Sequence, residues 1–317
     1  MYKILANDGI SKNGVEELEA AGFEVSTVTV AQEQLENYIN NEGIVALLVR
    51  SATTVRKDLI DACPSLKIIG RGGVGMDNID VEYARGKGLH VINTPAASSE
   101  SVAELVFAHL FSGVRYLYDA NRNMPLDGDS KFKSLKKAYA KGTELRGKTL
   151  GVIGFGRIGQ ATAKIGLGLG MKVIAHDPFM DKASVTIPFF DGQSLTFDIE
   201  IQTKEAVLKQ ADFLSLHVPA QKDFVIGTAE LELMKDGAGL VNAARGGVVD
   251  EVAMVEALKS GKLSFAGVDT FENEPTPAVQ VLMTPNVSLT PHIGAATTQA
   301  QERIGSELAS QIISILK

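Results

Sequence analysis

A glycine-rich hexapeptide directly after an apolar run constrains the fold of this chain more than any other feature. Residues 154–159 read Gly-Phe-Gly-Arg-Ile-Gly; they follow the apolar run 149–153 and precede a stretch rich in alanine, isoleucine and leucine. The first glycine permits a tight turn, the second lets backbone approach a phosphate, and the third lets the helix pack on the strand. A helix N-terminus also favours an anion. The pattern predicts a strand, a turn and a helix that together hold the pyrophosphate of a dinucleotide.

An acidic residue after the next strand-like run narrows the choice of dinucleotide. Asp177 stands eighteen residues beyond Gly159, and no arginine follows it in the stretch 177–179. A carboxylate at this place accepts hydrogen bonds from the ribose hydroxyls of NAD and repels the 2′-phosphate of NADP. The sequence therefore favours NAD as the cofactor.

Short β-rich runs alternate with helical patterns along the whole chain. This alternation predicts an α/β protein with two doubly wound parallel-sheet domains. We expect a Rossmann NAD-binding domain at residues 97–292 and a discontinuous, flavodoxin-like substrate domain at residues 1–96 and 293–317. We expect one long helix at residues 99–118, then a polar connection to residue 147. Asp191-Gly192 lies between alternating runs and predicts an inserted hairpin within residues 181–203.

Composition excludes several classes of partner. The formal net charge is −7, and an acidic chain repels nucleic acid and anionic membranes. The single cysteine, Cys63, rules out an internal disulfide and fits a reducing compartment. Residues 1–6 are typical of a first strand rather than a signal peptide. We therefore expect a cytoplasmic protein, and the five histidines and one cysteine show no metal-ligand spacing.

Three polar clusters that follow predicted strands supply a chemical function. They carry Arg245, Glu274 and His292. Taken singly, these residues have ordinary interpretations: a surface ion pair, a solvated carboxylate and a structural histidine. Together they fit the oxidation of a 2-hydroxy acid, because an imidazole exchanges the hydroxyl proton, a carboxylate stabilises the imidazolium, and a guanidinium binds the substrate carboxylate through two bonds.

The order of these motifs resembles that of the D-isomer-specific 2-hydroxyacid dehydrogenases over essentially the whole chain. The matching elements are the glycine loop, Asp177, Asn-x-Ala-Arg-Gly from residue 242, Asp-x-Phe-x-x-Glu-Pro from residue 269, and Pro-His-x-Gly from residue 291. The resemblance implies that Arg245 binds the substrate carboxylate and that His292 is the acid/base paired with Glu274.

The resemblance also implies a set of cofactor contacts. Asp269 contacts the nicotinamide carboxamide, and His217 lies on the adenosine side. Val74 and Val218 stand where related sequences often carry threonine, so each loses one hydrogen bond worth about 1 kcal/mol. The full cofactor set is Gly154, Gly156, Arg157, Ile158, Gly159, Asp177, His217, Val218, Ala243, Ala244, Arg245, Asp269, His292, Gly294, Ala295 and Val74.

Within the family, the sequence looks most like the members that oxidise 3-phospho-D-glycerate to 3-phosphohydroxypyruvate, the first step of phosphorylated serine biosynthesis. The stretches 49–53, 70–78, 93–95 and 142–149 carry this likeness. A glycine-rich loop is expected to hold a carboxylate through its N–H groups, and Arg50 a phosphate; the alternative for Arg50 is an ion pair at a strand end. The implied substrate-binding residues are Arg50, Ser51, Gly72, Gly73, Val74, Asn93, Arg245 and His292.

Several alternatives stay open at this point. Lys136, Lys137 and Lys141 are candidates for the substrate phosphate or for a solvated basic face. The substrate is alternatively hydroxypyruvate, glyoxylate or D-lactate, and a second alternative is an NAD-sensing protein similar to the corepressors that share this fold. The chain ends after its last predicted helix, so we expect no serine-binding regulatory domain. The helix at 99–118 resembles the arm through which family members form homodimers.

Overall fold

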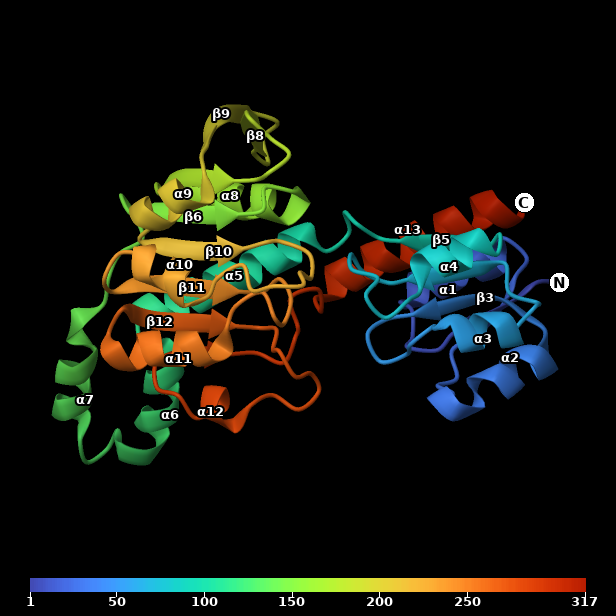
Figure 1. Ribbon diagram of the computed structural model, residues 1–317, viewed down its shortest axis with the longest axis horizontal. Helices are drawn as coiled ribbons and strands as arrows, with labels where there is room; N and C mark the ends of the chain where they lie inside the picture. The colour runs from blue at the N-terminus through green and yellow to red at the C-terminus, as the bar shows by residue number, and fades with distance from the viewer. The chain divides into compact units, whose positions relative to one another are not determined.

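The computed structural model describes residues 1–317, which form two compact units (Figure 1). Unit 1 comprises Met1–Ser101 and Ala295–Lys317, and unit 2 comprises Val102–Gly294. The sequence predicts boundaries at 96/97 and 292/293, whereas the chain passes from one unit to the other at 101/102 and 294/295. Helix α5 begins at Ser99, so its first turn belongs with unit 1. None of the helices has both the length and the apolar character needed to cross a membrane.

Unit 1 is a five-stranded parallel sheet with helices on both faces. Its strand order, β2-β1-β3-β4-β5, is that of flavodoxin-like folds, as predicted. Successive residues of β3 enter different cores: Leu47 packs on one face and Leu48 on the other. The strands are β1 (Lys3–Ala6), β2 (Glu24–Ser26), β3 (Ile44–Val49), β4 (Ile68–Arg71) and β5 (His90–Asn93).

The helices of unit 1 divide between these two cores. Helices α1 and α13 cover one face, and a Cβ on Gly14 of α1 would lie 2.9 Å from the Cα of Gly305 on α13, so glycine permits their close approach. Asn13 Nδ2 donates to the carbonyl oxygen of Glu302 at 3.0 Å and joins the same pair. The helices are α1 (Lys12–Ala20), α2 (Leu35–Glu42), α3 (Lys57–Ala62), α4 (Val81–Gly86) and α13 (Thr298–Leu316), with the 3-10 turn η1 (Gln32–Gln34).

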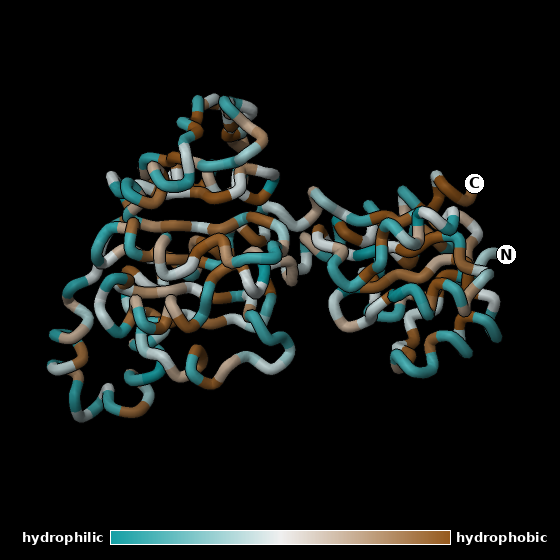
Figure 2. The backbone as a smooth tube through the Cα atoms, viewed as in Figure 1, coloured by the Kyte–Doolittle hydropathy of each residue, from teal (hydrophilic) through white to brown (hydrophobic).

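Unit 2 contains an eight-stranded sheet with the order β13-β12-β11-β10-β6-β7-β9-β8. The order β9-β7-β6-β10-β11-β12 is the Rossmann order, and only the β8–β9 pair is antiparallel. Figure 2 shows hydrophobic residues along the strands of each unit. The strands are β6 (Thr149–Ile153), β7 (Lys172–His176), β8 (Ala183–Pro188), β9 (Ser194–Ile201), β10 (Phe213–Leu216), β11 (Ala238–Asn242), β12 (Leu263–Val268) and β13 (Val287–Leu289).

The helices of unit 2 cover both faces of this sheet. Helices α5 and α8 pack on one face, and α9, α10 and α11 pack on the other. The helices are α5 (Ser99–Val114), α6 (Leu117–Asp127), α7 (Phe132–Ala138), α8 (Arg157–Gly168), α9 (Lys204–Gln210), α10 (Thr228–Leu233), α11 (Glu251–Ser260) and α12 (Val279–Leu282), with the 3-10 turn η2 (Tyr139–Lys141).

Two predictions for unit 2 need correction. The helix predicted at 99–118 ends at Val114, because Tyr116 takes a left-handed φ of +57° and the carbonyl oxygen of Val114 accepts the N–H of Thr143 instead of a helical one. The segment predicted only as a polar connection to residue 147 contains the helices α6 and α7 and the turn η2. These helices are short and largely exposed, so they lack the long apolar periodicity that marks a helix in a sequence.

The inserted hairpin is present and extends the sheet. Strands β8 and β9 pair around Asp191 and Gly192, and Gly192 takes a left-handed φ of +85°. Strand β9 also pairs in parallel with β7, so it serves as a regular strand of the Rossmann sheet while β8 forms its edge.

Candidate active site

The glycine loop joins β6 to α8 at the carboxyl edge of the unit 2 sheet. Gly154 has a φ of +88°, and a Cβ there would lie 2.4 Å from the carbonyl oxygen of His217. A Cβ on Gly159 would lie 2.2 Å from the carbonyl oxygen of Gly154, so neither position accepts a larger residue. Gly156 instead faces open space, and no side chain caps α8. This uncapped, open helix N-terminus fits a dinucleotide pyrophosphate.

Two polar side chains stand beside this loop. Asp177 Oδ2 accepts the N–H of Phe155 at 2.8 Å, and Oδ1 accepts the N–H of Phe179 at 2.9 Å; each oxygen keeps a lone pair for a ribose hydroxyl. Burial lowers the pKa of His217 to about 3, so its ring is neutral at pH 7. Its Nε2 contacts Ser215 Oγ at 2.9 Å, and its buried Nδ1 has no protein partner. A buried nitrogen without a partner fits a contact to a polar ligand.

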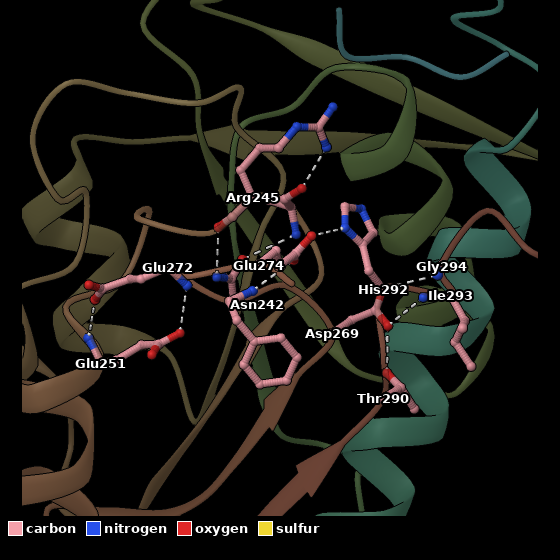
Figure 3. Close-up of polar contacts among 12 residues, drawn as sticks. Asn242, Arg245, Glu251, Asp269, Glu272, Glu274, Thr290, His292, Ile293 and Gly294 are labelled. Carbon is pink, nitrogen blue, oxygen red and sulfur yellow. Dashed lines mark hydrogen bonds and ion pairs between the residues drawn. The ribbon is translucent and has the colours of Figure 1, made fainter. Parts of the chain in front are cut away.

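The predicted acid/base residues, Glu274 and His292, form a close side-chain pair (Figure 3). Glu274 Oε2 lies 2.8 Å from His292 Nδ1. Glu274 Oε1 accepts the N–H of Phe271 at 3.0 Å, which fixes the carboxylate. Because the ring directs an Nδ1 proton at the carboxylate, Nε2 is the atom left to exchange a proton. The side chains of His292 and Glu274 are 39% and 35% exposed, so a small molecule is able to reach them.

Arg245 lies in the loop after β11. Buried Asn242 holds this loop, since its Nδ2 donates to the carbonyl oxygen of Arg245 at 3.0 Å and its Oδ1 accepts the N–H of Ala244 at 3.1 Å. A Cβ on Gly246 would lie 1.8 Å from the carbonyl oxygen of Phe271, so only glycine lets the two loops pack this closely. Figure 3 shows Glu274 between Arg245 and His292. The guanidinium of Arg245 donates through Nη1 to the carbonyl oxygen of Ala244 at 2.6 Å. Arg245, Glu274 and His292 thus lie in the loops that follow β11, β12 and β13, at the carboxyl edge of the sheet.

Asp269, at the end of β12, fastens the loop that carries His292. It is 1% exposed and accepts three hydrogen bonds: from the N–H of Ile293 at 2.8 Å, the N–H of Gly294 at 2.9 Å, and the hydroxyl of Thr290 at 2.6 Å. His292 itself has a left-handed φ of +54°, which costs energy for a residue other than glycine. The bonds to Asp269 offset that cost.

The remaining predicted cofactor residues have simple placements. Arg157 and Ile158 form the first turn of α8, while Ala243 and Ala244 are buried in the loop before Arg245. Val218 follows His217, and its Cγ1 would lie 3.0 Å from a Cβ on Gly154. Ala295 begins the second segment of unit 1.

Six predicted substrate-binding residues belong to unit 1 and lie at or just after the carboxyl ends of its strands. Arg50 and exposed Ser51 come after β3, where the N–H of Arg50 donates to Asp8 Oδ2 at 2.6 Å and Asn78 Nδ2 donates to the carbonyl oxygen of Arg50 at 2.7 Å. The contacts of Arg50 are made by its backbone, and its guanidinium has no protein partner, so the ion pair considered from the sequence is absent. The others are Gly72, Gly73, Val74 and Asn93.

The glycine loop of unit 1 is shaped by an arginine that sequence reasoning missed. Gly73 has a φ of +152°, and a Cβ there would lie 1.9 Å from Arg71 Nη1, which donates to the carbonyl oxygen of Gly72 at 3.0 Å. Asn93 Nδ2 donates to the carbonyl oxygen of Val74 at 2.7 Å and so braces the loop. The only sequence signal for this role of Arg71 is its position next to the glycines. The bond from Arg50 to Asp8 spans 42 residues and has no local sequence pattern.

The structure does not bring the three candidate lysines to Arg245 and His292 within one chain. Lys136 and Lys137 are exposed on α7, and Lys141 is exposed in η2. This segment lies at the amino edge of the sheet (Figure 1), since Thr143 just after it shares a cavity with Ala238, the first residue of β11. The site residues follow the opposite, carboxyl edge.

Comparison with known proteins gives the family of the chain. Residues 107–294, more than half of the chain, match the model of the D-isomer specific 2-hydroxyacid dehydrogenase, NAD binding domain. A hydroxypyruvate reductase of Thermotoga maritima is 40% identical over 99% of this chain and 98% of its own length. A D-3-phosphoglycerate dehydrogenase of Methanocaldococcus jannaschii is 41% identical over 100% of this chain, which spans only 58% of that relative's length.

Solved structures agree with these relatives. The crystal structure of a D-lactate dehydrogenase from Aquifex aeolicus, complexed with NAD and lactic acid, has a TM-score of 0.74 and 29% identity, covering 100% of this chain and 95% of the other. The glycine loop, the Glu274–His292 pair and these similar proteins all indicate the same family. The chain belongs to the D-isomer specific 2-hydroxyacid dehydrogenases, a family of NAD-dependent oxidoreductases.

Proposed function

We propose that the protein oxidises 3-phospho-D-glycerate to 3-phosphohydroxypyruvate with reduction of NAD. The observation that carries the proposal is the 2.8 Å contact between Glu274 Oε2 and His292 Nδ1, which leaves the ring Nε2 to exchange a proton. Arg245, in the neighbouring loop, is the cation that the substrate carboxylate requires.

The proposed mechanism assigns one task to each side chain. Arg245 binds the carboxylate of the 2-hydroxy acid and sets the orientation of C2. His292 Nε2 accepts the hydroxyl proton, and the negative charge of Glu274 stabilises the imidazolium that forms. NAD, held at the glycine loop, would supply the acceptor for the hydride of C2. In the reverse direction His292 returns the proton to the carbonyl oxygen.

We propose that the cofactor is held by the residues around the glycine loop. The N–H groups of Arg157 and Ile158 meet the pyrophosphate, Asp177 accepts from the ribose hydroxyls, and His217 lies on the adenosine side. Asp269 meets the carboxamide of the nicotinamide. The other proposed contacts are Gly154, Gly156, Gly159, Val218, Ala243, Ala244, Arg245, His292, Gly294, Ala295 and Val74.

The phosphorylated substrate is proposed on the basis of Arg50. Its guanidinium has no partner in the protein while its backbone is held rigidly by Asp8 and Asn78. A guanidinium without a counter-ion, on a backbone that is held by two hydrogen bonds, suits a phosphate. Ser51, Gly72, Gly73, Val74 and Asn93 are the other proposed substrate contacts.

A second candidate is the reduction of hydroxypyruvate. The hydroxypyruvate reductase of Thermotoga maritima matches this chain over 98% of its own length, whereas the phosphoglycerate dehydrogenase of Methanocaldococcus jannaschii is matched over 58%. The two oxo acids differ only by a phosphate, so the same Arg245, Glu274 and His292 serve both reactions.

One experiment separates the two candidates. Purified protein is assayed with NAD and 3-phospho-D-glycerate or D-glycerate, and with NADH and 3-phosphohydroxypyruvate, hydroxypyruvate, glyoxylate or pyruvate. We expect kcat/KM to be at least tenfold higher for the phosphorylated acid, and Arg50→Met to remove that preference without lowering kcat/KM for D-glycerate. A preference for hydroxypyruvate that Arg50→Met leaves unchanged would assign the protein to the second candidate.

We further propose that the protein forms a two-fold homodimer through the arm made by α5, α6 and α7. This arm exposes large apolar side chains to an unusual degree: Phe111, Leu117, Met124, Leu126 and Phe132 are 40–76% exposed. Light scattering that gives the mass of two chains, and of one chain for Leu126→Lys combined with Phe132→Lys, is the expected result.

A further inference from the structure

A buried histidine lies behind the active-site loop, on the helix that covers the sheet. His109 is on α5 and 2% exposed, and no step of the proposed mechanism uses it. Its ring packs where β12 has Gly267, since a Cβ on that glycine would lie 2.6 Å from His109 Cβ. Its neighbours on α5, Val106 and Leu110, are apolar. An imidazole in such a layer costs free energy unless both nitrogens are bonded, so its contacts indicate its role.

The hydrogen bonds of His109 form one directed chain that ends at Asp269. Thr290 Oγ1 donates its proton to Asp269 Oδ1 at 2.6 Å, so it is an acceptor toward the histidine. His109 Nε2 therefore carries the ring proton and donates it to Thr290 Oγ1 at 3.0 Å. Nδ1 is then an acceptor, and Ser288 Oγ donates to it at 2.9 Å. Burial lowers the pKa of His109, which keeps the ring neutral and the direction of the chain fixed.

Asp269 connects this chain to the backbone that follows His292. The oxygen that accepts from Thr290 also accepts the N–H of Ile293, and the other oxygen accepts the N–H of Gly294. His292 is in the left-handed region, where a residue other than glycine stays only if its surroundings hold it. The Asp269 carboxylate is thus hydrogen-bonded to the Thr290 hydroxyl, and the Thr290 hydroxyl in turn to His109.

We propose that His109 is a positioning residue: acting through Thr290 and Asp269, it fixes the backbone at Ile293 and Gly294 and thereby the direction of the His292 ring. The inference rests on the proposed function, because it takes His292 as the group that exchanges the substrate proton. A 2% exposed imidazole is able to do this because it bonds two hydroxyls at once, on Ser288 and Thr290. An apolar side chain would leave the Ser288 hydroxyl without a partner and Thr290 Oγ1 with only its bond to Asp269.

Two matched pairs of variants test the proposal. His109→Leu removes both bonds, whereas His109→Gln keeps an N–H that is able to donate to Thr290. Thr290→Val breaks the chain at a different point with little change in volume, and Thr290→Ser keeps the hydroxyl; this pair decides the matter if His109→Leu fails to fold. Leu110→Ala, on the same helix, lowers stability without touching the chain and serves as the control.

The measurements separate positioning from stability. Hydrogen exchange of the Ile293 and Gly294 amides is followed by NMR without substrate, together with kcat, KM and the Kd for ADP-ribose, which probes the glycine loop alone. We expect His109→Leu and Thr290→Val to speed exchange at these two amides and to lower kcat, each about tenfold, with the Kd for ADP-ribose unchanged. His109→Gln and Thr290→Ser recover most of both effects, and Leu110→Ala changes neither relative to the other amides.

The outcomes that overturn the proposal are specific. Exchange at Ile293 and Gly294 that stays at the wild-type rate in His109→Leu and Thr290→Val rejects it, and so does an equal loss in His109→Leu and His109→Gln. If the wild-type protein turns over no 2-hydroxy acid, the proposed function fails, while the exchange rates still decide whether His109 holds the loop.

Discussion

His292 and His109 are the same residue in opposite surroundings, and both are connected to the loop that follows β13. His292 has an exposed ring that faces one carboxylate through Nδ1. His109 is buried, bonds two hydroxyls and faces no charge directly. The first arrangement engages one nitrogen of the ring and leaves the other open to substrate. The second stabilises a neutral ring whose two nitrogens are both hydrogen-bonded within the protein. The roles that we propose for the two histidines, proton transfer for His292 and positioning for His109, therefore follow from their environments and not from the residue type.

The largest expected effect comes from removing the exposed histidine. We expect His292→Ala to lower kcat by about 10²- to 10⁴-fold, because general acid–base catalysis contributes that much. The stability of the protein and the Kd for ADP-ribose should change little, since the ring is 39% exposed and lies apart from the glycine loop in the sequence. Steady-state kinetics measures kcat, and a thermal melt measures stability. Turnover that survives the substitution would assign proton transfer to a different group.

A smaller effect is expected from the partner of His292. Glu274→Gln keeps the size of the side chain and a carbonyl acceptor for Nδ1–H, but removes the charge that stabilises the imidazolium. We expect kcat to fall by roughly 10- to 100-fold, with KM for the hydroxy acid within about threefold of the wild-type value, because the change acts on proton transfer rather than on carboxylate binding. Glu272→Gln is the matched control, since Glu272 bonds the N–H of Glu251 and not His292. Equal losses in the two variants would show that the loop, and not the charge, matters.

The two histidines also differ in how far the sequence reveals them. Pro291-His292-Ile293-Gly294 and Glu274-Pro275 are short motifs at strand ends, so they were predicted as site residues; the structure places their side chains 2.8 Å apart. The partners of His109 lie 179 and 181 residues away. No local period or motif encodes a contact over that distance, and within the sequence His109 is one polar residue in an apolar helix.

The fold shows the same division. The Rossmann and flavodoxin-like orders follow from the alternation of strands and helices, and the Gly154 loop from the need for a positive φ. The end of α5 depends on the N–H of Thr143, which reaches Val114 from the far end of the arm, and such a capture has no sequence signature. Local chemistry is therefore predictable from this sequence, and long-range hydrogen bonds are not.

The smallest expected effect is a pH dependence of stability that separates the buried histidine from the exposed one. Burial lowers the pKa of His109 below that of an unfolded histidine, so below about pH 6.5 the unfolded chain binds a proton that the folded protein excludes. Stability is thus fully present above that pH and is lost as the pH falls, by at most about 1.4 kcal/mol per pH unit for one such group. His217, whose pKa burial lowers to about 3, adds a loss of the same sign.

Urea unfolding of the wild-type protein and of His109→Gln at pH 7, 6 and 5 measures this term. We expect the free energy of unfolding to decrease less steeply in His109→Gln than in the wild-type protein as the pH falls. Only one buried neutral histidine, His217, then remains to bind a proton on unfolding. His292→Gln is the matched control: its ring is exposed and next to a carboxylate, so the variant should not lose the acid-labile term that burial creates. Parallel slopes for the wild-type protein and His109→Gln would mean that His109 accepts a proton in the folded state, and the directed chain from Ser288 to Asp269 would then be reversible with pH.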